Sequence, residues 1–129
     1  MAAKTVINYL SKNNVKEIND TLVPVSERGF LYEGGIDFVT YGVVYEYEDL
    51  PIRDAIVGKA AYLWYQIASN QYFVNGNKRT GFTTADVFLR INGLTLTANI
   101  DEKQYLSSAI ARGAYSVESV RVEIAQYIK

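Results

Sequence analysis

An apolar stripe between residues 56 and 67 constrains the fold of this chain more than any other feature. It follows Pro51, a residue that suits the first turn of a helix. Its members recur every three or four residues over about three turns, the spacing of one helix face: Ile56, Val57, Ala60, Leu63, Trp64 and Ile67. A stripe this apolar predicts a helix at the centre of the core.

The segment before Pro24 is expected to be helical in one or two pieces. Its apolar residues form two stripes at helical spacing: Val6, Ile7 and Leu10, then Val15, Ile18 and Leu22. Asn13 and Asn14 lie between the stripes and act as either a break or a cap. Pro24 ends the segment, because a proline disfavours helical geometry in the residue before it.

Three further helices are expected in the second half of the chain. The first runs over residues 78–92 and ends at Gly93, and the second runs over 101–112 and ends at Gly113. The third begins after the N-cap residue Ser116 and continues to residue 128. Together the helices predict a core around these residues: Ile56, Ala60, Leu63, Trp64, Ile67, Phe73, Phe88 and Leu89.

Residues 30–47 are the one segment that favours extended chain. Tyrosines and β-branched residues surround the pair Gly34 and Gly35, which suggests a β-hairpin near residues 31–47. An irregular loop packed by its aromatic side chains fits the same composition. The whole pattern predicts one domain over residues 1–129, all-α and compact, with about five to seven helices and a small β-element.

Composition excludes several classes of function. The 129 residues include no cysteine and no histidine, which excludes thiol nucleophiles, Ser-His triads and His-ligated metals. A net charge of −1 lacks the basic surface that direct nucleic-acid binding needs. No apolar run approaches the roughly 20 residues of a membrane span, and the N-terminus shows no signal-peptide pattern. We expect a cytoplasmic protein.

A short polar loop enters the predicted helix at residue 78 and carries the chemistry. The first N–H groups of a helix lack partners and attract anions. Gly76 allows close approach to the backbone, and Lys78 and Arg79 add two positive charges at the same place. Cations are unfavourable there unless an anion binds, so the loop is interpreted as a phosphate-binding loop. A Gly-Asn turn with two solvated bases is the alternative.

Residues 71–80, Gln-Tyr-Phe-Val-Asn-Gly-Asn-Lys-Arg-Thr, resemble the signature of the Fic/Doc family. That signature is His-x-Phe-x-(Asp/Glu/Asn)-(Gly/Ala)-Asn-(Gly/Lys)-Arg-Thr, and the Asn-Lys-Arg-Thr form is similar to the Doc (death-on-curing toxin) branch. The likeness continues in Tyr-Glu-Asp-Leu at residues 47–50 and in Phe-Leu-Arg-Ile-Asn-Gly at 88–93. It extends over about residues 14–128, the length of a Doc-like helical bundle.

The resemblance implies a function. Fic proteins transfer AMP from ATP to a protein hydroxyl, whereas Doc-type toxins transfer the γ-phosphate to a threonine of elongation factor Tu and block translation. It also implies ATP and Mg²⁺, a separate antitoxin protein, and a β-hairpin flap that pairs with the target. On this basis the flap residues would be Val39, Tyr41, Val43, Val44 and Tyr45. The phosphate-binding residues would be Gly76, Asn77, Lys78, Arg79 and Thr80, with Lys78 and Arg79 also counted as catalytic.

Several positions depart from the family pattern. Gln71 occupies the place of the catalytic His, and an amide cannot take a proton from a hydroxyl near neutral pH. Asn75 occupies the usual place of the magnesium carboxylate, where an amide oxygen binds magnesium more weakly. Phe82 replaces a second arginine of the AMP-transferring members, which argues against AMP transfer. The autoinhibitory pattern fails at Ser119 to Glu123, because Ile124 follows, so an inhibitor would be a separate chain.

Two origins fit Gln71: a change introduced to make a toxic protein producible, or a natural member that lacks the base. The intact loop favours the first.

Three hypotheses about function follow from the sequence. The leading one is a Doc-like toxin crippled by Gln71. The second is a catalytically dead Fic-fold protein that binds a nucleotide or a partner for regulation. The third is a helical adapter or nucleic-acid-binding module, which the charge balance disfavours.

Overall fold

The computed structural model describes residues 6–129, which form six α-helices. Over these residues it contains no β-strand, only two isolated bridges, so the all-α prediction is confirmed. Two short 3₁₀ helices join the longer elements. In chain order the elements are α1 (Lys12–Leu22), η1 (Val25–Glu27), α2 (Glu33–Gly42), η2 (Val43–Tyr45), α3 (Ile52–Ser69), α4 (Asn77–Ile91), α5 (Ile100–Ala111) and α6 (Val117–Ala125).

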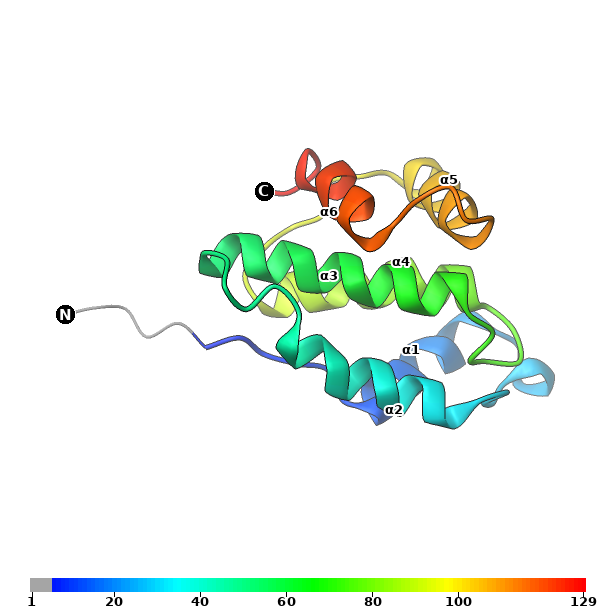
Figure 1. Cartoon of the computed structure of the whole chain (residues 1–129). Coiled ribbons are helices and arrows are strands. Elements are labelled where there is room, and N and C mark those ends of the chain that lie inside the picture. Colours follow the sequence, from blue (N-terminus) through cyan, green and yellow to red (C-terminus); the bar gives the residue numbers. More distant parts are fainter. Residues whose placement is uncertain (1–5) are drawn as a thin grey trace.

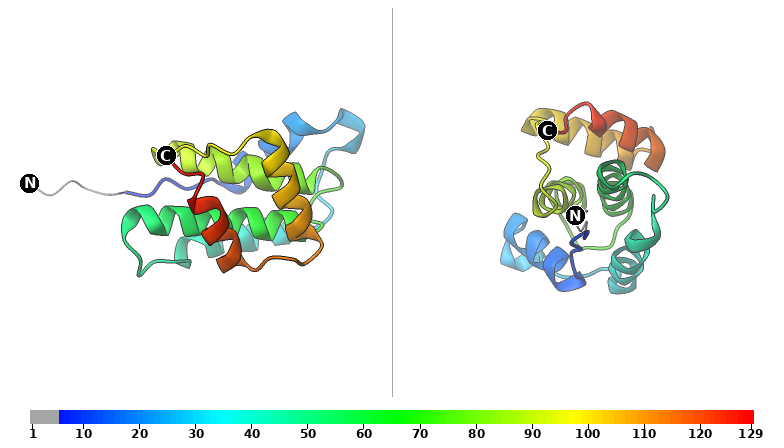
Figure 2. Two further views of the ribbon diagram at one scale, coloured as in Figure 1. Left: turned by 90° about the horizontal axis from the view of Figure 1, so that it is seen from above. Right: turned by 90° about the vertical axis from the view of Figure 1, so that its left-hand side faces the viewer.

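Helices α3 and α4 form an antiparallel pair at the centre of the molecule (Figure 1). Helices α1 and α2 cover one side of this pair, and α5 and α6 cover the other (Figure 2). The predicted core is confirmed, because all eight of its residues are buried: Ile56, Ala60, Leu63, Trp64, Ile67, Phe73, Phe88 and Leu89. No helix within residues 6–129 combines the length and the apolar character needed to cross a bilayer.

The N-terminal prediction is correct for α1 and wrong for the residues before it. Residues 6–10 are extended, and α1 begins after Ser11, whose hydroxyl accepts the Asn14 amide proton in a capping box. The extended stretch caps the end of α4: the Asn8 N–H donates to Asn92 Oδ1 at 2.8 Å, and Asn92 Nδ2 donates to the Asn8 carbonyl at 3.0 Å. Residues 1–5 of the predicted helix lie outside the described residues.

The predicted β-hairpin is wrong, because residues 33–42 form helix α2. Ile36, Val39 and Val43 follow one helix face and are buried against α3 and α1. Gly35 is needed for packing and not for a turn. A Cβ atom at this position would lie 2.2 Å from the ring of Tyr72, so only glycine lets the ring rest on the helix. Tertiary packing therefore explains the glycine that suggested a hairpin.

Helices in the second half of the chain begin and end close to their predicted positions. Ser116 caps α6 as predicted, and Asn99 caps α5 in the same way. Gly93 and Gly113 take positive φ angles just after α4 and α5. Helix α6 ends at Ala125 and not at residue 128, because the C-terminal residues turn away to pair with residues 95–97, with Lys129 and Thr95 exchanging two hydrogen bonds of 2.9 Å.

Candidate functional site: the loop before α4

The loop of residues 70–76 connects α3 to α4 and ends in a left-handed glycine. Gly76 is the N-cap of α4 and has φ 78°, a conformation that other residues adopt only with strain. A Cβ atom here would also lie 2.6 Å from Val23 Cγ1. No side chain caps α4, whereas capping boxes close α1, α5 and α6. The first amide groups of α4 are therefore available to a ligand.

The side chain of Asn77 fixes the shape of this loop. It is buried, and it bonds to both backbone groups of Phe73: Oδ1 accepts the amide proton at 2.9 Å, and Nδ2 donates to the carbonyl at 3.0 Å. Phe73 itself is fully buried and stacks on Phe30 with ring centroids 5.1 Å apart. The loop is thus anchored from within, by an amide and an aromatic ring.

A second segment runs antiparallel beside the loop along almost its whole length. We call residues 22–32 the strap. Leu31 and Tyr32 both donate to the Tyr72 carbonyl, at 2.8 and 2.9 Å, and the Val74 N–H donates to the Gly29 carbonyl at 3.0 Å. At the other end Arg79 Nη1 donates to the Leu22 carbonyl at 3.1 Å. These contacts hold the loop against α1 and α2. Burial raises the pKa of Tyr72.

Asn19 supports the loop from behind, on the face turned toward α1. Its fully buried Nδ2 donates to the Asn75 carbonyl at 2.8 Å and to the Thr80 hydroxyl at 3.0 Å. Asn19 was not among the predicted site residues, although an asparagine within the apolar stripe of α1, four residues after Val15, signals a buried polar contact. Thr80 is fully buried, so its hydroxyl meets Asn19 and not a phosphate.

The outer face of the loop lines a pocket of about 320 Å³. Lys78 and Arg79 are exposed at its edge. The backbone of Lys78 is fixed from the opposite side, because the Ser107 hydroxyl donates to its carbonyl at 3.0 Å and accepts the indole N–H of Trp64 at 2.6 Å. The pocket is lined by Ala68, Gln71, Val74, Asn75, Gly76, Asn77, Lys78, Arg79 and Ala111. Loop, basic residues and helix N-terminus thus meet in one place.

Gln71 is exposed and lies at the start of this pocket. Its Oε1 accepts a hydrogen bond from Asn77 Nδ2 at 3.3 Å. The same amide that shapes the loop therefore also orients the Gln71 side chain. The Gln71 amide supplies donors and an acceptor to the pocket, but no group that could accept a proton near neutral pH.

Asn75 bonds to the strap and to its own loop. Its Nδ2 donates to Glu27 Oε1, and its Oδ1 accepts the Gly76 N–H at 2.7 Å. Within residues 6–129 no cluster of three or more Asp, Glu, His or Cys side chains could hold a metal by itself. The donor set here is one amide oxygen and one carboxylate. This set fits a magnesium ion carried mainly by nucleotide phosphates, with these side chains as minor ligands.

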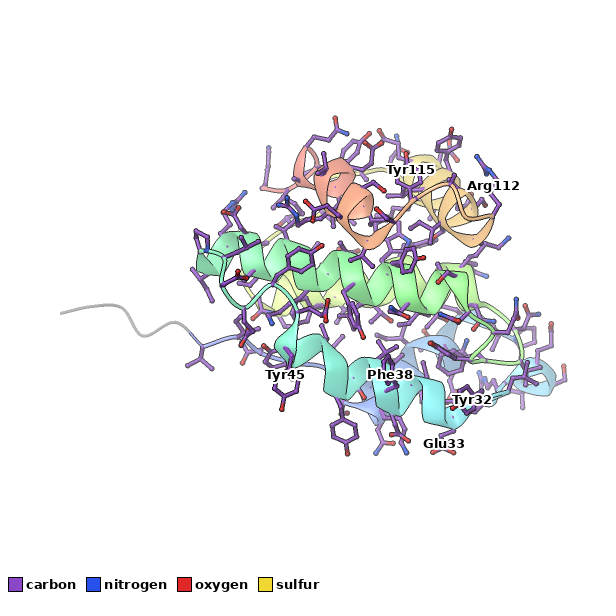
Figure 3. The ribbon with its side chains drawn as sticks, in the orientation of Figure 1. Tyr32, Glu33, Phe38, Tyr45, Arg112 and Tyr115 are labelled. Carbon is purple, nitrogen blue, oxygen red and sulfur yellow. The ribbon has the colours of Figure 1, made fainter. Side chains whose placement is uncertain are left out.

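The residues predicted for the flap are divided between the core and the surface. Val39 and Val43 are buried, so the prediction that they contact a target is wrong. Val44 is half-buried, while Tyr41 and Tyr45 are 75% and 79% exposed. Figure 3 shows Tyr32 just before α2, Phe38 on α2 and Tyr45 in the η2 turn that follows it. Strand addition is excluded over residues 33–42, since their backbone groups bond within the helix.

Comparison with known proteins supports the family that the sequence of the loop resembles. The model of the Fic/DOC family matches residues 9–89, from the segment just before α1 to Leu89 near the end of α4. The chain belongs to the Fic/Doc family. Within it the similarity is to the Doc branch: a protein named Toxin Doc, from Mycolicibacterium smegmatis, is 37% identical over 71 residues. This match covers 54% of the chain and 55% of the relative, so the chain spans about half the length of that protein.

Proposed function

We propose that this Fic/Doc chain is a Doc-like toxin that binds ATP at the loop before α4. One observation carries the proposal: the N-terminus of α4 has no side-chain cap, and Lys78 and Arg79 stand exposed at the same pocket. An uncapped helix N-terminus with two bases is a ready site for phosphate groups. The similarity to Toxin Doc supports the toxin role.

The proposed reaction transfers the γ-phosphate of ATP to a threonine hydroxyl of a target protein. The hydroxyl oxygen bonds to the γ-phosphorus, the bond to the bridging oxygen breaks, and ADP leaves. The hydroxyl proton must pass to a base. The amides of α4 with Lys78 and Arg79 would position the phosphates and neutralise their charge, which is most of what phosphoryl transfer asks of a protein. Transfer of AMP is the less favoured version, because Phe82 fills the place of a second arginine.

Proton removal is the step that this chain performs poorly. Gln71 occupies the position of the family's base and has no basic nitrogen. Loss of a general base typically slows a reaction by about 10²–10⁴-fold. The chain should therefore bind ATP and transfer phosphate only feebly. Magnesium, when bound to the nucleotide, would neutralise phosphate charge, with Asn75 and Glu27 nearby.

The partners follow from the same proposal. A separate antitoxin protein would hold an active form of this chain in check, and elongation factor Tu is the proposed target in the cytoplasm. Because α2 replaces the expected hairpin, the target would meet exposed side chains such as Tyr41 and Tyr45 and not a strand edge. The alternative is a catalytically dead regulatory protein that uses the intact loop to bind a nucleotide or a partner, and Gln71 is the observation that favours it.

Calorimetric titration with ATP tests the binding part of the proposal. Arg79→Ala should weaken ATP binding by about 1.5–3 kcal/mol, the range for hydrogen bonds to charged groups. Arg53→Ala is the matched control, since Arg53 is an exposed arginine at the opposite end of α3 from the loop. Equal ATP affinity in the wild type and Arg79→Ala would overturn the assignment of the loop.

Growth assays test the toxin part. Expression of Gln71→His should arrest growth, and co-expression of the antitoxin should relieve the arrest. Gln71→Ala, which also removes the amide but adds no base, should not arrest growth. If Gln71→His is as harmless as Gln71→Ala, the regulatory alternative becomes the better account.

A further inference from the structure

A second pocket lies on the far side of the central pair, between α5 and α6. Both helices lie on the same side of α3 (Figure 1). Their side chains and those of α3 enclose a gap of about 340 Å³. We call this gap the α5–α6 pocket. It is lined by Trp64, Ala98, Asp101, Glu102, Tyr105, Leu106, Glu123, Ile124 and Tyr127. None of these residues lines the pocket at the loop before α4.

The chemistry of the α5–α6 pocket changes from its floor to its rim. The floor is apolar and buried, formed by Trp64, Leu106 and Ile124. The rim carries three carboxylates, two from the first turn of α5 and one from α6: Asp101, Glu102 and Glu123. A ligand that fits both parts must present an alkyl portion to the floor and a positive charge to the rim.

The rim carboxylates have no cation of their own among the described residues. The ion pairs found within residues 6–129 involve six other acidic residues, and no lysine or arginine nitrogen lies within 4.0 Å of the three rim carboxylates. Glu102 accepts a hydrogen bond from the Asn99 N–H, and Glu123 accepts one from the Gln126 side-chain amide, and both donors are neutral. The Glu102 carboxylate, acting first as a hydrogen-bond acceptor for the Tyr127 hydroxyl, raises the pKa of Tyr127.

We propose that the α5–α6 pocket binds a lysine side chain presented by a partner polypeptide. The three carboxylates of the pocket would repel the phosphates of a nucleotide, whereas its apolar floor and acidic rim suit one long cationic side chain. Lysine is favoured over arginine because its long alkyl stem covers apolar surface while its compact ammonium group reaches carboxylates around it. The lining residue Tyr105 already has an arginine beside it, because the Arg112 guanidinium lies 5.9 Å from the centroid of the Tyr105 ring.

The fluorescence of Trp64 provides a direct assay, because it is the single tryptophan of the chain and lies in the pocket floor. The probe is N-acetyl-lysine methylamide, and N-acetyl-norleucine methylamide is the control ligand with the same alkyl chain and no charge. The lysine probe should change the emission of Trp64 in a saturable way, and high salt should weaken its binding. The norleucine analogue should bind more weakly.

Variants then assign the binding to the rim. Asp101→Asn and Glu123→Gln keep the shape of the side chains and should each weaken binding of the lysine probe about two- to fivefold, the range for partly exposed ion pairs. Asp49→Asn removes an exposed carboxylate outside the pocket and should leave binding unchanged. Circular dichroism checks that each variant stays folded.

Three results would overturn the inference. They are an unsaturable response to the lysine probe, equal binding of the norleucine analogue, and tighter binding of free butylamine than of the capped lysine, which would argue against a polypeptide ligand. Because the assay uses no ATP, none of these outcomes depends on the function proposed for the loop before α4.

Discussion

Asn77 holds Phe73 by both of its backbone groups, with Oδ1 accepting the amide proton at 2.9 Å and Nδ2 donating to the carbonyl at 3.0 Å. One buried side chain therefore closes the turn that precedes α4. The same Nδ2 reaches Gln71 at 3.3 Å, so the shape of the loop and the direction of the Gln71 side chain depend on one amide.

Asn77→Asp should destabilise the protein by about 1–3 kcal/mol, because the carboxylate loses both Nδ2 donations and leaves a buried carbonyl without its partner. It should also weaken ATP binding, since a negative charge then stands at the phosphate loop. Urea unfolding and calorimetry measure the two effects. Asn13→Asp, an exposed asparagine in α1, is the control, and equal stability losses in both variants would contradict this role for Asn77.

The central helices could be predicted from the sequence because their stabilising contacts follow one regular pattern. Apolar residues at helical spacing, such as Leu63 and Ile67, can be recognised without knowing the partner helix. The loop before α4 could also be recognised, since Lys78 and Arg79, next to Gly76, conflict with the preference of a helix start for anions. The structure brings these residues together at one pocket.

Helix α2 could not be predicted because its residues are chosen for packing against distant parts of the chain and not for a local helical pattern. Gly35 makes room for Tyr72, and exposed aromatics such as Phe38 and Tyr41 give the segment the composition of a strand. The only local signal was the spacing of the buried Ile36, Val39 and Val43. The strap was missed for a related reason: most of its contacts with the loop use backbone groups, which leave no residue pattern.

The contact between Trp64 and Ser107 should contribute strongly to stability. Ser107→Ala leaves the buried indole N–H without a partner and should cost about 1–3 kcal/mol, whereas Trp64→Ala should cost about 3–5 kcal/mol because it also opens a cavity. Ser108→Ala is the matched control on α5. Circular dichroism during urea unfolding measures all three, and a solvent-exposed indole at Trp64 would show that the arrangement of α3 is wrong.

The pH dependence of stability should reflect the contact between α6 and residue 47. The Arg121 guanidinium, helped by the Tyr47 hydroxyl, lowers the pKa of Glu118 from 4.5 to about 2. The unfolded chain therefore takes up this proton first as the pH falls, so the stabilisation is present above about pH 4.5 and is lost toward pH 2. Glu118→Gln should flatten the loss in that window, measured by urea unfolding at a series of pH values.

The loss of folding stability at alkaline pH should depend on Tyr47. Burial, with Glu118 beside the hydroxyl, raises the pKa of Tyr47 from 10.0 to about 12. Its stabilisation is present below pH 10 and is lost as the pH rises toward 12, because the unfolded chain ionises first. Tyr47→Phe should remove this part of the alkaline loss. If the free energy of unfolding changes with pH in Glu118→Gln and Tyr47→Phe as it does in the wild type, Tyr47, Glu118 and Arg121 do not set the pH dependence.

Metal binding near Asn75 can be tested without any reaction. Asn75→Asp would place two carboxylates in contact, since Asn75 now donates to Glu27. Without metal this repulsion should lower stability by about 1 kcal/mol. Magnesium should raise the melting temperature of Asn75→Asp more than that of the wild type. If magnesium stabilises both proteins equally, this position does not take part in metal binding.

Transfer of label from ATP by the Gln71→His variant tests the central claim most directly. Incubation with elongation factor Tu and either γ-labelled or α-labelled ATP separates phosphate transfer from AMP transfer. Restoring the base should raise incorporation of the γ label at least about a hundredfold over the wild type. The pH profile should show a group titrating near 6–7. The α label should not be incorporated. Incorporation of neither label, with ATP binding intact, would contradict the account of a toxin disabled by Gln71.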